Sequence, residues 1–360
     1  MNIDVLFEIL LHLPVRSLLR FIVVHKSWYY IVNSPHFRKL YTLRRNNNKD
    51  EEVHLYFRSY FFTGGTQVSI NLLDNRKSLI SYDFRHIDQS VRSGEVKLLC
   101  YISSRGLVCI SSRDELGITI CNPFLGQFKI LPLPSLHCRR YHHFDHHHEG
   151  LGFDENYKVV QLLSNHHSLH ANLYSAKTNS WSELDNIDQD LVIENPIKSV
   201  GKNGSFSHWV GYTRSENKKI ILSFDMKNEV FRTTSISLLG DEVFYDSRGF
   251  RVLAKSDYSF VVLVFDRQRL KVYESSGEGS ELVWNNVSNV ELKPFWRRKI
   301  LKMDDIPIWR NDDCVVVRGS KFGEVILYDY HARKFIRRFN IHSSIHGDDI
   351  IEYEGSLISP

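Results

Sequence analysis

The chain has 360 residues, a formal net charge of +4 at pH 7 and 42% hydrophobic residues. This length and apolar content favour folded domains over disorder, and so small a charge does not by itself indicate a nucleic-acid or membrane partner. The five cysteines form no Cys-x-x-Cys pair, and no stretch approaches the roughly 20 apolar residues of a membrane helix. We therefore expect a protein of the cytoplasm, the nucleus or both, without a membrane partner.

Apolar residues at helical spacing open the chain. They recur every three or four positions from Val5 to Leu13, which predicts a first helix that Pro14 ends and a second helix that Pro14 opens. The run from Trp28 to Val32 predicts a third helix, and Ser34-Pro35 precedes one last helical turn. A unit of about 40 residues rarely encloses all of its apolar surface. Its leucines must therefore be covered by the rest of this chain or by another protein.

The order of residues in this helical segment carries a family resemblance. Its main blocks are Asp4-Val5-Leu6-Phe7-Glu8-Ile9-Leu10, Leu13-Pro14-Val15-Arg16-Ser17-Leu18-Leu19-Arg20-Phe21, Lys26-Ser27-Trp28 and Ser34-Pro35-His36-Phe37. The segment is similar to an F-box, which implies that residues 1–43 are a domain that docks on a Skp1-type adaptor and, through it, on a cullin–RING ubiquitin ligase. By the same resemblance, the residues that supply or support adaptor binding are Leu6, Ile9, Leu10, Leu13, Pro14, Leu18, Leu19, Val24 and Trp28.

A repeat of about 50 residues organises the rest of the chain. Residues 44–52, RRNNNKDEE, predict a linker, and residues 53–360 alternate short apolar runs with turn-forming clusters, as in a chain of antiparallel strands. In each repeat an apolar strand and a polar turn lead to a large apolar residue that starts the next strand. These anchor residues, which we expect to lie in the core rather than to contact a ligand, are Leu79, Phe128, Trp181, Phe231, Trp284 and Phe335.

This period has the length of a propeller blade of four strands. We therefore predict a small all-α domain of three to four short helices followed by an all-β domain, a kelch-like β-propeller of six or seven blades. Six copies are visible in the sequence, and a seventh could be hidden or shared between the two ends. A β-sandwich is the alternative, because the Gly-Gly pairs of kelch repeats are largely absent.

Several short phrases of the β-rich region carry a second resemblance. They are Gly106-Leu107-Val108, Cys121-Asn122-Pro123, Leu131-Pro132, Gly152-Phe153-Asp154, Tyr157-Lys158-Val159-Val160, Tyr174-Ser175 with Trp181, and Tyr353-Glu354-Gly355-Ser356-Leu357-Ile358-Ser359-Pro360. The region is similar to the plant-type F-box-associated domain, and the chain resembles the S-locus F-box proteins of pollen. This resemblance implies a receptor for a target protein, with the target contacts on loops, but it identifies neither the target nor its contact residues.

The segment 137–150, HCRRYHHFDHHHEG, has the residue types of a metal site. Imidazole, thiolate and carboxylate all bind zinc, but their spacing here fits no closed structural site. We therefore expect a solvated loop between strands and no bound metal. Partner recognition that depends on pH through these histidines is a further hypothesis.

No catalytic motif stands out in the sequence. The chain has no Gly-x-x-x-x-Gly-Lys loop, no Gly-x-Ser-x-Gly elbow and no cysteine in a nucleophile context. We expect no enzyme, no cofactor and, because the basic runs are short, no nucleic-acid partner. The leading interpretation is the substrate-recognition subunit of an SCF-type (Skp1–cullin–F-box) E3 ubiquitin ligase, which presents a target protein for ubiquitination and degradation. The alternative is a β-propeller enzyme or carbohydrate-binding protein whose N-terminal helices are only structural.

Overall fold

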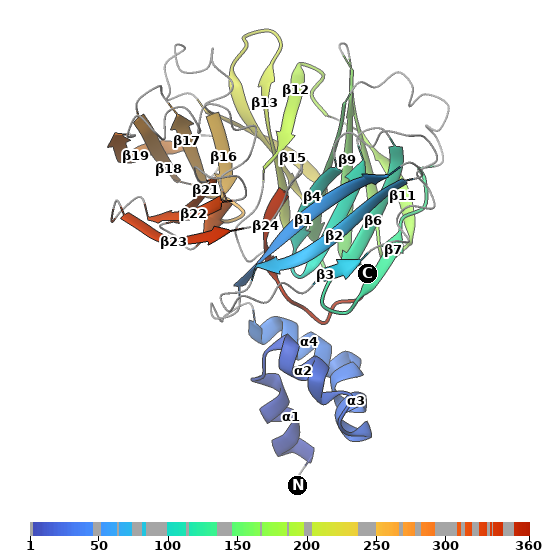
Figure 1. The fold of residues 1–360 in the computed structure, drawn as a ribbon. Helices are drawn as coiled ribbons and strands as arrows, with labels where there is room; N and C mark the ends of the chain where they lie inside the picture. The colour runs from blue at the N-terminus through green and yellow to red at the C-terminus, as the bar shows by residue number, and fades with distance from the viewer. Residues whose placement is uncertain are drawn as a thin grey trace. The chain divides into compact units, whose positions relative to one another are not determined.

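Four helices precede a long series of strands in the computed structural model of the chain (Figure 1). The structure describes residues 3–45, 52–62, 65–73, 81–83, 99–112, 115–134, 146–165, 168–185, 187–197, 204–236, 250–265, 269–277, 282–291, 308–310, 314–318, 324–329, 332, 334–340 and 349–360. The chain divides into two compact units, one made of residues 1–131 with 353–360 and the other of residues 132–352.

The helices lie where the apolar spacing predicts them. They are α1 (Ile3–Leu11), α2 (Val15–Phe21), α3 (Lys26–Asn33) and α4 (Pro35–Arg45). Pro14 separates the first two helices with extended backbone, and its carbonyl accepts the first hydrogen bond of α2 from the Leu18 N–H at 2.9 Å. The Ser34 hydroxyl accepts a hydrogen bond from the Phe37 N–H at 3.2 Å and so caps α4, with proline at the first helical position.

Helix α4 is longer than the single turn that the sequence predicts. It has 11 residues, and Phe37 and Tyr41 on one of its faces are fully buried against the other helices. The Tyr41 hydroxyl also donates a hydrogen bond to the Leu13 carbonyl at 2.9 Å. Packing of this face therefore stabilises the helix. The many polar residues of the segment weaken its apolar periodicity, so the sequence predicts only one turn. The helix ends at Arg45 and the first strand begins at Glu52, so most of the predicted linker lies outside the described residues.

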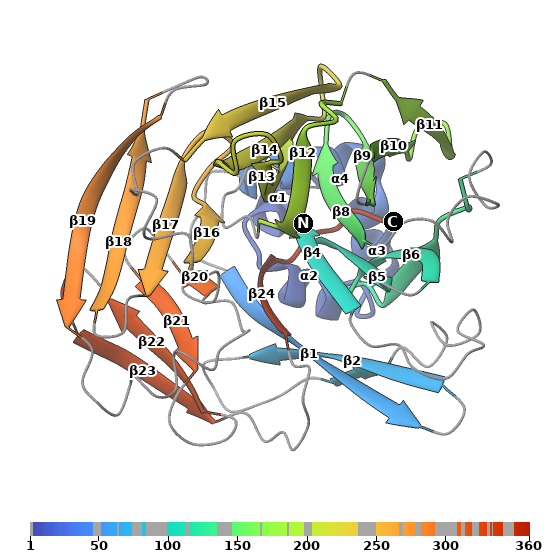
Figure 2. The same cartoon turned by 90° about the horizontal axis from the view of Figure 1, so that it is seen from above.

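The β-rich region forms six four-stranded sheets within the described residues (Figure 2). Its strands are β1 (Glu52–Phe62), β2 (Gly65–Leu73), β3 (Ser81–Asp83), β4 (Leu99–Ser104), β5 (Leu107–Ser112), β6 (Glu115–Asn122), β7 (Gln127–Ile130), β8 (His146–Phe153), β9 (Tyr157–Ser164), β10 (Leu169–Ser175), β11 (Ser180–Leu184), β12 (Leu191–Pro196), β13 (Phe206–Thr213), β14 (Lys219–Asp225), β15 (Val230–Ser235), β16 (Phe250–Ala254), β17 (Phe260–Phe265), β18 (Arg269–Ser276), β19 (Val283–Glu291), β20 (Ile308–Arg310), β21 (Cys314–Arg318), β22 (Glu324–Asp329), β23 (Lys334–Asn340) and β24 (Asp349–Glu354).

Five of the sheets each consist of four strands that are consecutive in the chain, from β4–β7 to β20–β23. The remaining sheet has the order β24-β1-β2-β3, so it combines the first three strands with the last one. The sequence suggests that a seventh unit could be hidden or shared between the two ends. Within the described residues the sheet that the two ends share is one of the six, not a seventh. Sharing a sheet in this way joins distant parts of the chain by backbone hydrogen bonds.

The repeat read from the sequence corresponds to the hairpin between the third and fourth strands of a sheet. Each anchor opens the fourth strand opposite the end of the third, in the pairs Cys121 with Phe128, Tyr174 with Trp181, Phe224 with Phe231, Ser275 with Trp284, and Tyr328 with Phe335. The Leu79 anchor lies outside the described residues. The prediction that anchors are core residues holds for the buried Trp284 and is wrong for Phe128, which is 42% exposed. Both residues lie on edge strands, β7 and β19, but Trp284 packs in the apolar cluster that the sheets β12–β15 and β16–β19 share.

The turn before the anchor repeats as well. In three sheets the residue two positions before the anchor has a positive φ, at Gly126 (62°), Asn179 (52°) and Glu229 (56°). Glycine and asparagine are the usual residues for this backbone region. The Tyr174 hydroxyl donates a hydrogen bond to the Asn179 side chain at 2.7 Å, and the Glu229 carboxylate is held by Lys158. Side-chain contacts thus stabilise the turn where glycine is absent.

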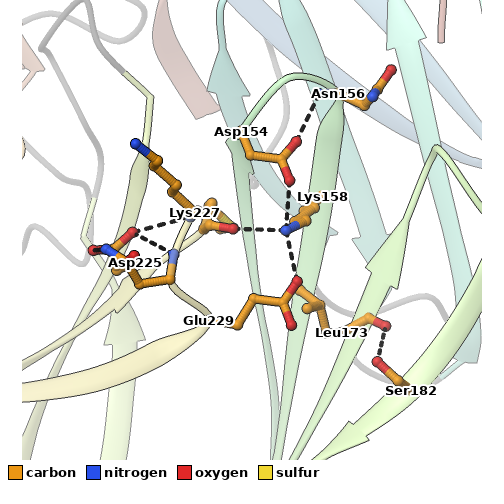
Figure 3. A network of polar contacts seen from close by, with 10 residues as sticks. Asp154, Asn156, Lys158, Leu173, Ser182, Asp225, Lys227 and Glu229 are labelled. Carbon is orange, nitrogen blue, oxygen red and sulfur yellow. Dashed lines mark hydrogen bonds and ion pairs between the residues drawn. The ribbon is translucent and has the colours of Figure 1, made fainter.

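A buried lysine connects the sheet β8–β11 to the sheet β12–β15 (Figure 3). The Lys158 ammonium group lies 2.7 Å from a carboxylate oxygen of Asp154, 2.7 Å from one of Glu229 and 2.8 Å from the Met226 carbonyl. All three of its protons therefore have acceptors. Burial alone would lower the pKa of Lys158, but the hydrogen bonds to the two carboxylates outweigh it and raise the pKa. The phrases Gly152-Phe153-Asp154 and Tyr157-Lys158-Val159-Val160 meet in this network.

A buried histidine lies deeper in the same unit. His208 on β13 has its Nδ1 atom 2.8 Å from the Ser223 hydroxyl oxygen, and its ring packs against Phe206 and Phe260. Burial lowers the pKa of His208 to about 3. The ring is therefore neutral in the folded chain at every pH at which this protein is expected to work.

Replacing Lys158 by methionine tests the connection between the two sheets. We expect Lys158→Met to lower the free energy of unfolding by about 2 kcal/mol, because two partly exposed carboxylates and a buried carbonyl lose their donor. Urea denaturation followed by circular dichroism measures the change. The control is Lys177→Met, in an exposed turn, which should leave the midpoint unchanged. Equal effects of the two variants would contradict the structural role of Lys158.

Acidification tests the burial of His208. The folded chain keeps this ring neutral, whereas the unfolded chain protonates it below about pH 6.5, so stability is lost as the pH falls from about 6.5 towards 3. Between pH 7 and pH 5, protonation of this residue in the unfolded chain lowers the free energy of unfolding by about 2 kcal/mol. The measurement is the difference in urea stability between these two pH values for the native chain and for His208→Gln. The variant should show the smaller difference, and identical pH dependence would contradict the prediction.

Candidate protein-docking surface

The four helices pack around a shared apolar cluster. Its buried helical residues are Leu6, Leu10, Leu11, Val15, Leu18, Val32, Phe37 and Tyr41. Three residues from elsewhere in the same compact unit complete it, namely Leu357 near the last strand and Phe124 and Leu125 in the turn between β6 and β7. The rest of the chain therefore covers part of the apolar surface of the helices.

Another part of that surface remains uncovered by the described residues. We define the exposed helical surface as the seven exposed large apolar residues of this segment, which are Ile3, Val5, Ile9, Val23, Val24, Tyr29 and Tyr30. Val5 and Ile9 are four residues apart in α1 and so lie on the same face. The two valines lie in the connection between α2 and α3, and the two tyrosines lie on α3 with their rings 5.8 Å apart. Neighbouring exposed apolar side chains, such as Val5 with Ile9 and Tyr29 with Tyr30, are typical of positions that contact another protein.

The nine residues predicted to supply or support adaptor binding fall into three groups by exposure. Ile9 and Val24 are 48% and 65% exposed. Leu13, Pro14, Leu19 and Trp28 are half-buried, and the Trp28 ring packs edge-on against Phe21 at 5.1 Å. Leu6, Leu10 and Leu18 are buried in the cluster. The structure therefore places the last three where they can support the helices, and only the first six where a partner can reach them.

Five members of the exposed helical surface were not among the predicted residues. They are Ile3, Val5, Val23, Tyr29 and Tyr30. The apolar spacing of α1 includes Val5 but does not say which side of the helix faces the cluster, because apolar residues surround most of this helix. Tyr30 could have been found from its position in α3, two residues before the buried Val32 and so on the opposite side of the helix, whereas this spacing does not predict the exposure of Tyr29.

Polar side chains connect α1 to α4 at the edge of the helical unit. Arg44 donates hydrogen bonds to the Glu8 carboxylate at 3.1 Å and to the His12 ring. The Glu8 and Arg44 side chains are largely exposed, so this ion pair adds little stability. This ion pair places charged side chains next to the apolar residues of α1. Protein interfaces usually have such a polar rim around an apolar centre.

The histidine-rich segment differs from the prediction. Residues 137–145 lie outside the described residues, but His146 to Glu149 belong to strand β8 and pair with β9, so this part is not a loop. His148 and Glu149 are buried between neighbouring strands. Within the described part of the chain, no group of three or more His, Cys, Asp and Glu residues lies close enough together to hold a metal ion.

A pocket of about 300 Å³ lies in the unit of residues 132–352. Phe206 and Tyr258 form an aromatic wall with their rings 5.1 Å apart, and the Arg232 guanidinium lies 5.8 Å from the centre of the Phe206 ring. Asp225 already pairs with Arg232 at 3.4 Å, so the cation is partly neutralised. The pocket therefore offers aromatic and hydroxyl contacts rather than an anion site.

Among the helices described, none is long and apolar enough to cross a membrane.

Comparison with known families assigns both parts of the chain. The F-box domain family matches residues 1–40, and the F-box associated beta propeller domain family matches residues 65–360. These matches confirm the predicted F-box and the predicted propeller, in preference to a β-sandwich. An F-box domain implies binding to a Skp1-type adaptor and, in general, the role of a substrate adaptor in an SCF ubiquitin ligase. Both domains belong to non-catalytic adaptor proteins, which confirms that the chain is not an enzyme.

Two F-box proteins of Arabidopsis thaliana agree with this assignment. One F-box protein of Arabidopsis thaliana is 27% identical over 240 residues, covering 64% of this chain and 58% of that protein. A second is 24% identical over 360 residues, covering 95% of this chain and 91% of that protein. Among solved structures, TolB from Acinetobacter baumannii matches with a TM-score of 0.48 and 9% identity over 88% of this chain and 72% of that one. The family match over residues 65–360 spans most of the sequence, and the chain therefore belongs to the F-box proteins that carry an F-box associated β-propeller domain.

Proposed function

We propose that this chain is the substrate-recognition subunit of an SCF-type E3 ubiquitin ligase, acting in the cytoplasm, the nucleus or both. It docks on a Skp1-type adaptor, and through it on a cullin–RING ligase, by means of the exposed helical surface, and its propeller holds a target protein for ubiquitination and degradation. The observation that supports this role is the division of the helical apolar surface. One part packs on Phe124, Leu125 and Leu357, and the other stays open to a partner.

The proposed contact assigns different roles to neighbouring leucines and isoleucines. Ile9 and Val24 insert into the adaptor, and each contributes roughly 1.5–3 kcal/mol when it is fully buried. Leu13, Pro14, Leu19 and Trp28 complete the edge of the contact, since they are only partly covered. Leu6, Leu10 and Leu18 hold the helices at the angles that present this surface. Helices that offer apolar faces to a partner's groove are a common mode of protein recognition.

The chain contributes proximity rather than chemistry to ubiquitin transfer. A target bound to the propeller is held near the transferring subunits, which raises its effective concentration there. The resemblance to S-locus F-box proteins gives an S-RNase of self-incompatibility as one candidate target, and other relatives of this kind recognise other proteins.

Charged substitutions on the exposed helical surface test the docking proposal. We expect the double variant Ile9→Asp with Val24→Asp to bind a purified Skp1-type adaptor at least about tenfold more weakly, because two carboxylates would have to be desolvated in the interface. Isothermal titration calorimetry measures the affinity. Both side chains are exposed, so the helical signal and the melting temperature should not change.

A matched control uses another exposed valine. Val283 on β19 is 60% exposed, and Val283→Asp should leave adaptor affinity unchanged. Adaptor binding by the double variant at native strength would contradict the proposed contact, and failure of the native chain to bind would contradict the proposed function. Charges at Leu10 or Leu18 would be uninformative, because these side chains are 1% and 0% exposed and the helical cluster would unfold.

A further inference from the structure

One buried asparagine connects the β6–β7 turn to the segment that follows β24. The Asn122 amide nitrogen donates hydrogen bonds to the Ser356 carbonyl at 3.0 Å and to the Ile358 carbonyl at 2.8 Å. Its amide oxygen accepts hydrogen bonds from the backbone N–H groups of Phe124 and Leu125 at 3.0 and 3.2 Å. The side chain is fully buried, and both its donors and its acceptor are satisfied.

Tyr353 and Gly355 strengthen the same connection. The Tyr353 hydroxyl lies 2.9 Å from the Gly106 carbonyl and 3.0 Å from the Asn122 amide oxygen, and its single proton can be donated to either. Gly355 passes so close to the Phe124 ring that a Cβ atom would lie 2.3 Å from a ring carbon. We define the 355–360 segment as residues Gly355 to Pro360. Its backbone is therefore fixed on the sheet β4–β7 by polar and steric contacts.

The same segment also contacts the helices. Leu357 is buried in the helical cluster, and the Ser359 hydroxyl accepts a hydrogen bond from the Arg38 guanidinium of α4 at 3.1 Å. Phe124 and Leu125, whose N–H groups bond to Asn122, pack against that cluster too. The F-box helices and the sheet β4–β7 are thus joined by the 355–360 segment, in addition to the covalent connection through residues 46–51. All these residues belong to one compact unit.

We infer that Asn122 is a positioning residue, which fixes the F-box on the first complete sheet of the propeller through the 355–360 segment. The functional consequence of this inference rests on the proposed function. It is that a target on the propeller keeps a defined place relative to the adaptor. A single covalent connection would leave the helices free to rotate. A bound target would then sample many positions, and the effective concentration at the site of ubiquitin transfer would fall.

Replacing Asn122 by aspartate separates this role from the folding of the turn. A carboxylate can still accept the hydrogen bonds from Phe124 and Leu125, but it cannot donate to the Ser356 and Ile358 carbonyls and repels them. We expect Asn122→Asp to lower the ratio of docked to released helices by roughly tenfold. Gly355→Ala is an independent variant, because it displaces the segment from the Phe124 ring without changing any polar group.

The direct measurement is a distance distribution within the full chain. Nitroxide labels introduced at the exposed positions Lys39 on α4 and Gln127 on β7 report on the helices and the sheet by double electron–electron resonance. A narrow distribution is expected for the native chain, and a broad one for Asn122→Asp, for Gly355→Ala and above all for their combination. A matched control is Asn172→Asp, an equally buried asparagine on β10, which should keep the distribution narrow.

The second measurement uses the reconstituted ligase, with the chain's own lysines as ubiquitin acceptors. The variants should bind the Skp1-type adaptor with native affinity, since the exposed helical surface is untouched, while self-ubiquitination spreads over more of the chain's lysines. Unchanged distance distributions in the combined variant would overturn the inference. If the native chain binds no adaptor, the proposed function fails, but the distance distributions still decide whether Asn122 positions the helices.

Discussion

The helical unit is too small to bury its own apolar side chains, and this constraint underlies the architecture of the whole chain. Its cluster is closed on one side by Leu357, Phe124 and Leu125, which come from segments more than 80 residues away in sequence. The exposed helical surface, including Ile9 and Val24, has no such cover within the described residues. The same shortage of internal cover thus explains both how the F-box is attached to the propeller domain and how it can bind a partner.

Buried polar side chains, rather than more apolar area, fix how neighbouring parts of each compact unit are placed. Lys158 uses all its protons to join the sheets β8–β11 and β12–β15, and Asn122 uses its whole amide to join the β6–β7 turn to the 355–360 segment. Apolar packing tolerates small shifts, whereas a buried donor without an acceptor is costly, so each polar group permits one arrangement. Both residues lie within phrases that carry the family resemblance, and the structure supplies a physical reason for those phrases.

Much of the fold could be predicted because it depends on residues that are close together in the sequence. Pro14 and Ser34-Pro35 end and begin helices through backbone geometry that needs no tertiary partner. The repeat of about 50 residues marks the hairpin between the third and fourth strands, since the turn and its anchor are adjacent in sequence. Helix α4 and strand β8 were mispredicted for the opposite reason. Phe37 and Tyr41 stabilise α4 through contacts with Phe7 and the Leu13 carbonyl, which are about 30 residues away in sequence. The segment His146 to Glu149 forms a strand because it pairs with β9, which its polar composition does not indicate.

The sequence by itself determined the two domain types, the positions of three of the four helices and the period of the sheets, because each follows from neighbouring residues. Only the tertiary structure decided that Leu10 and Leu18 support the helices while Ile9 and Val24 face outward, since apolar residues surround most of α1 and spacing alone cannot choose its inner face. It also decided the role of Asn122. A hydrogen bond between residues 122 and 358 leaves no local pattern, and it forms only when the whole chain has folded.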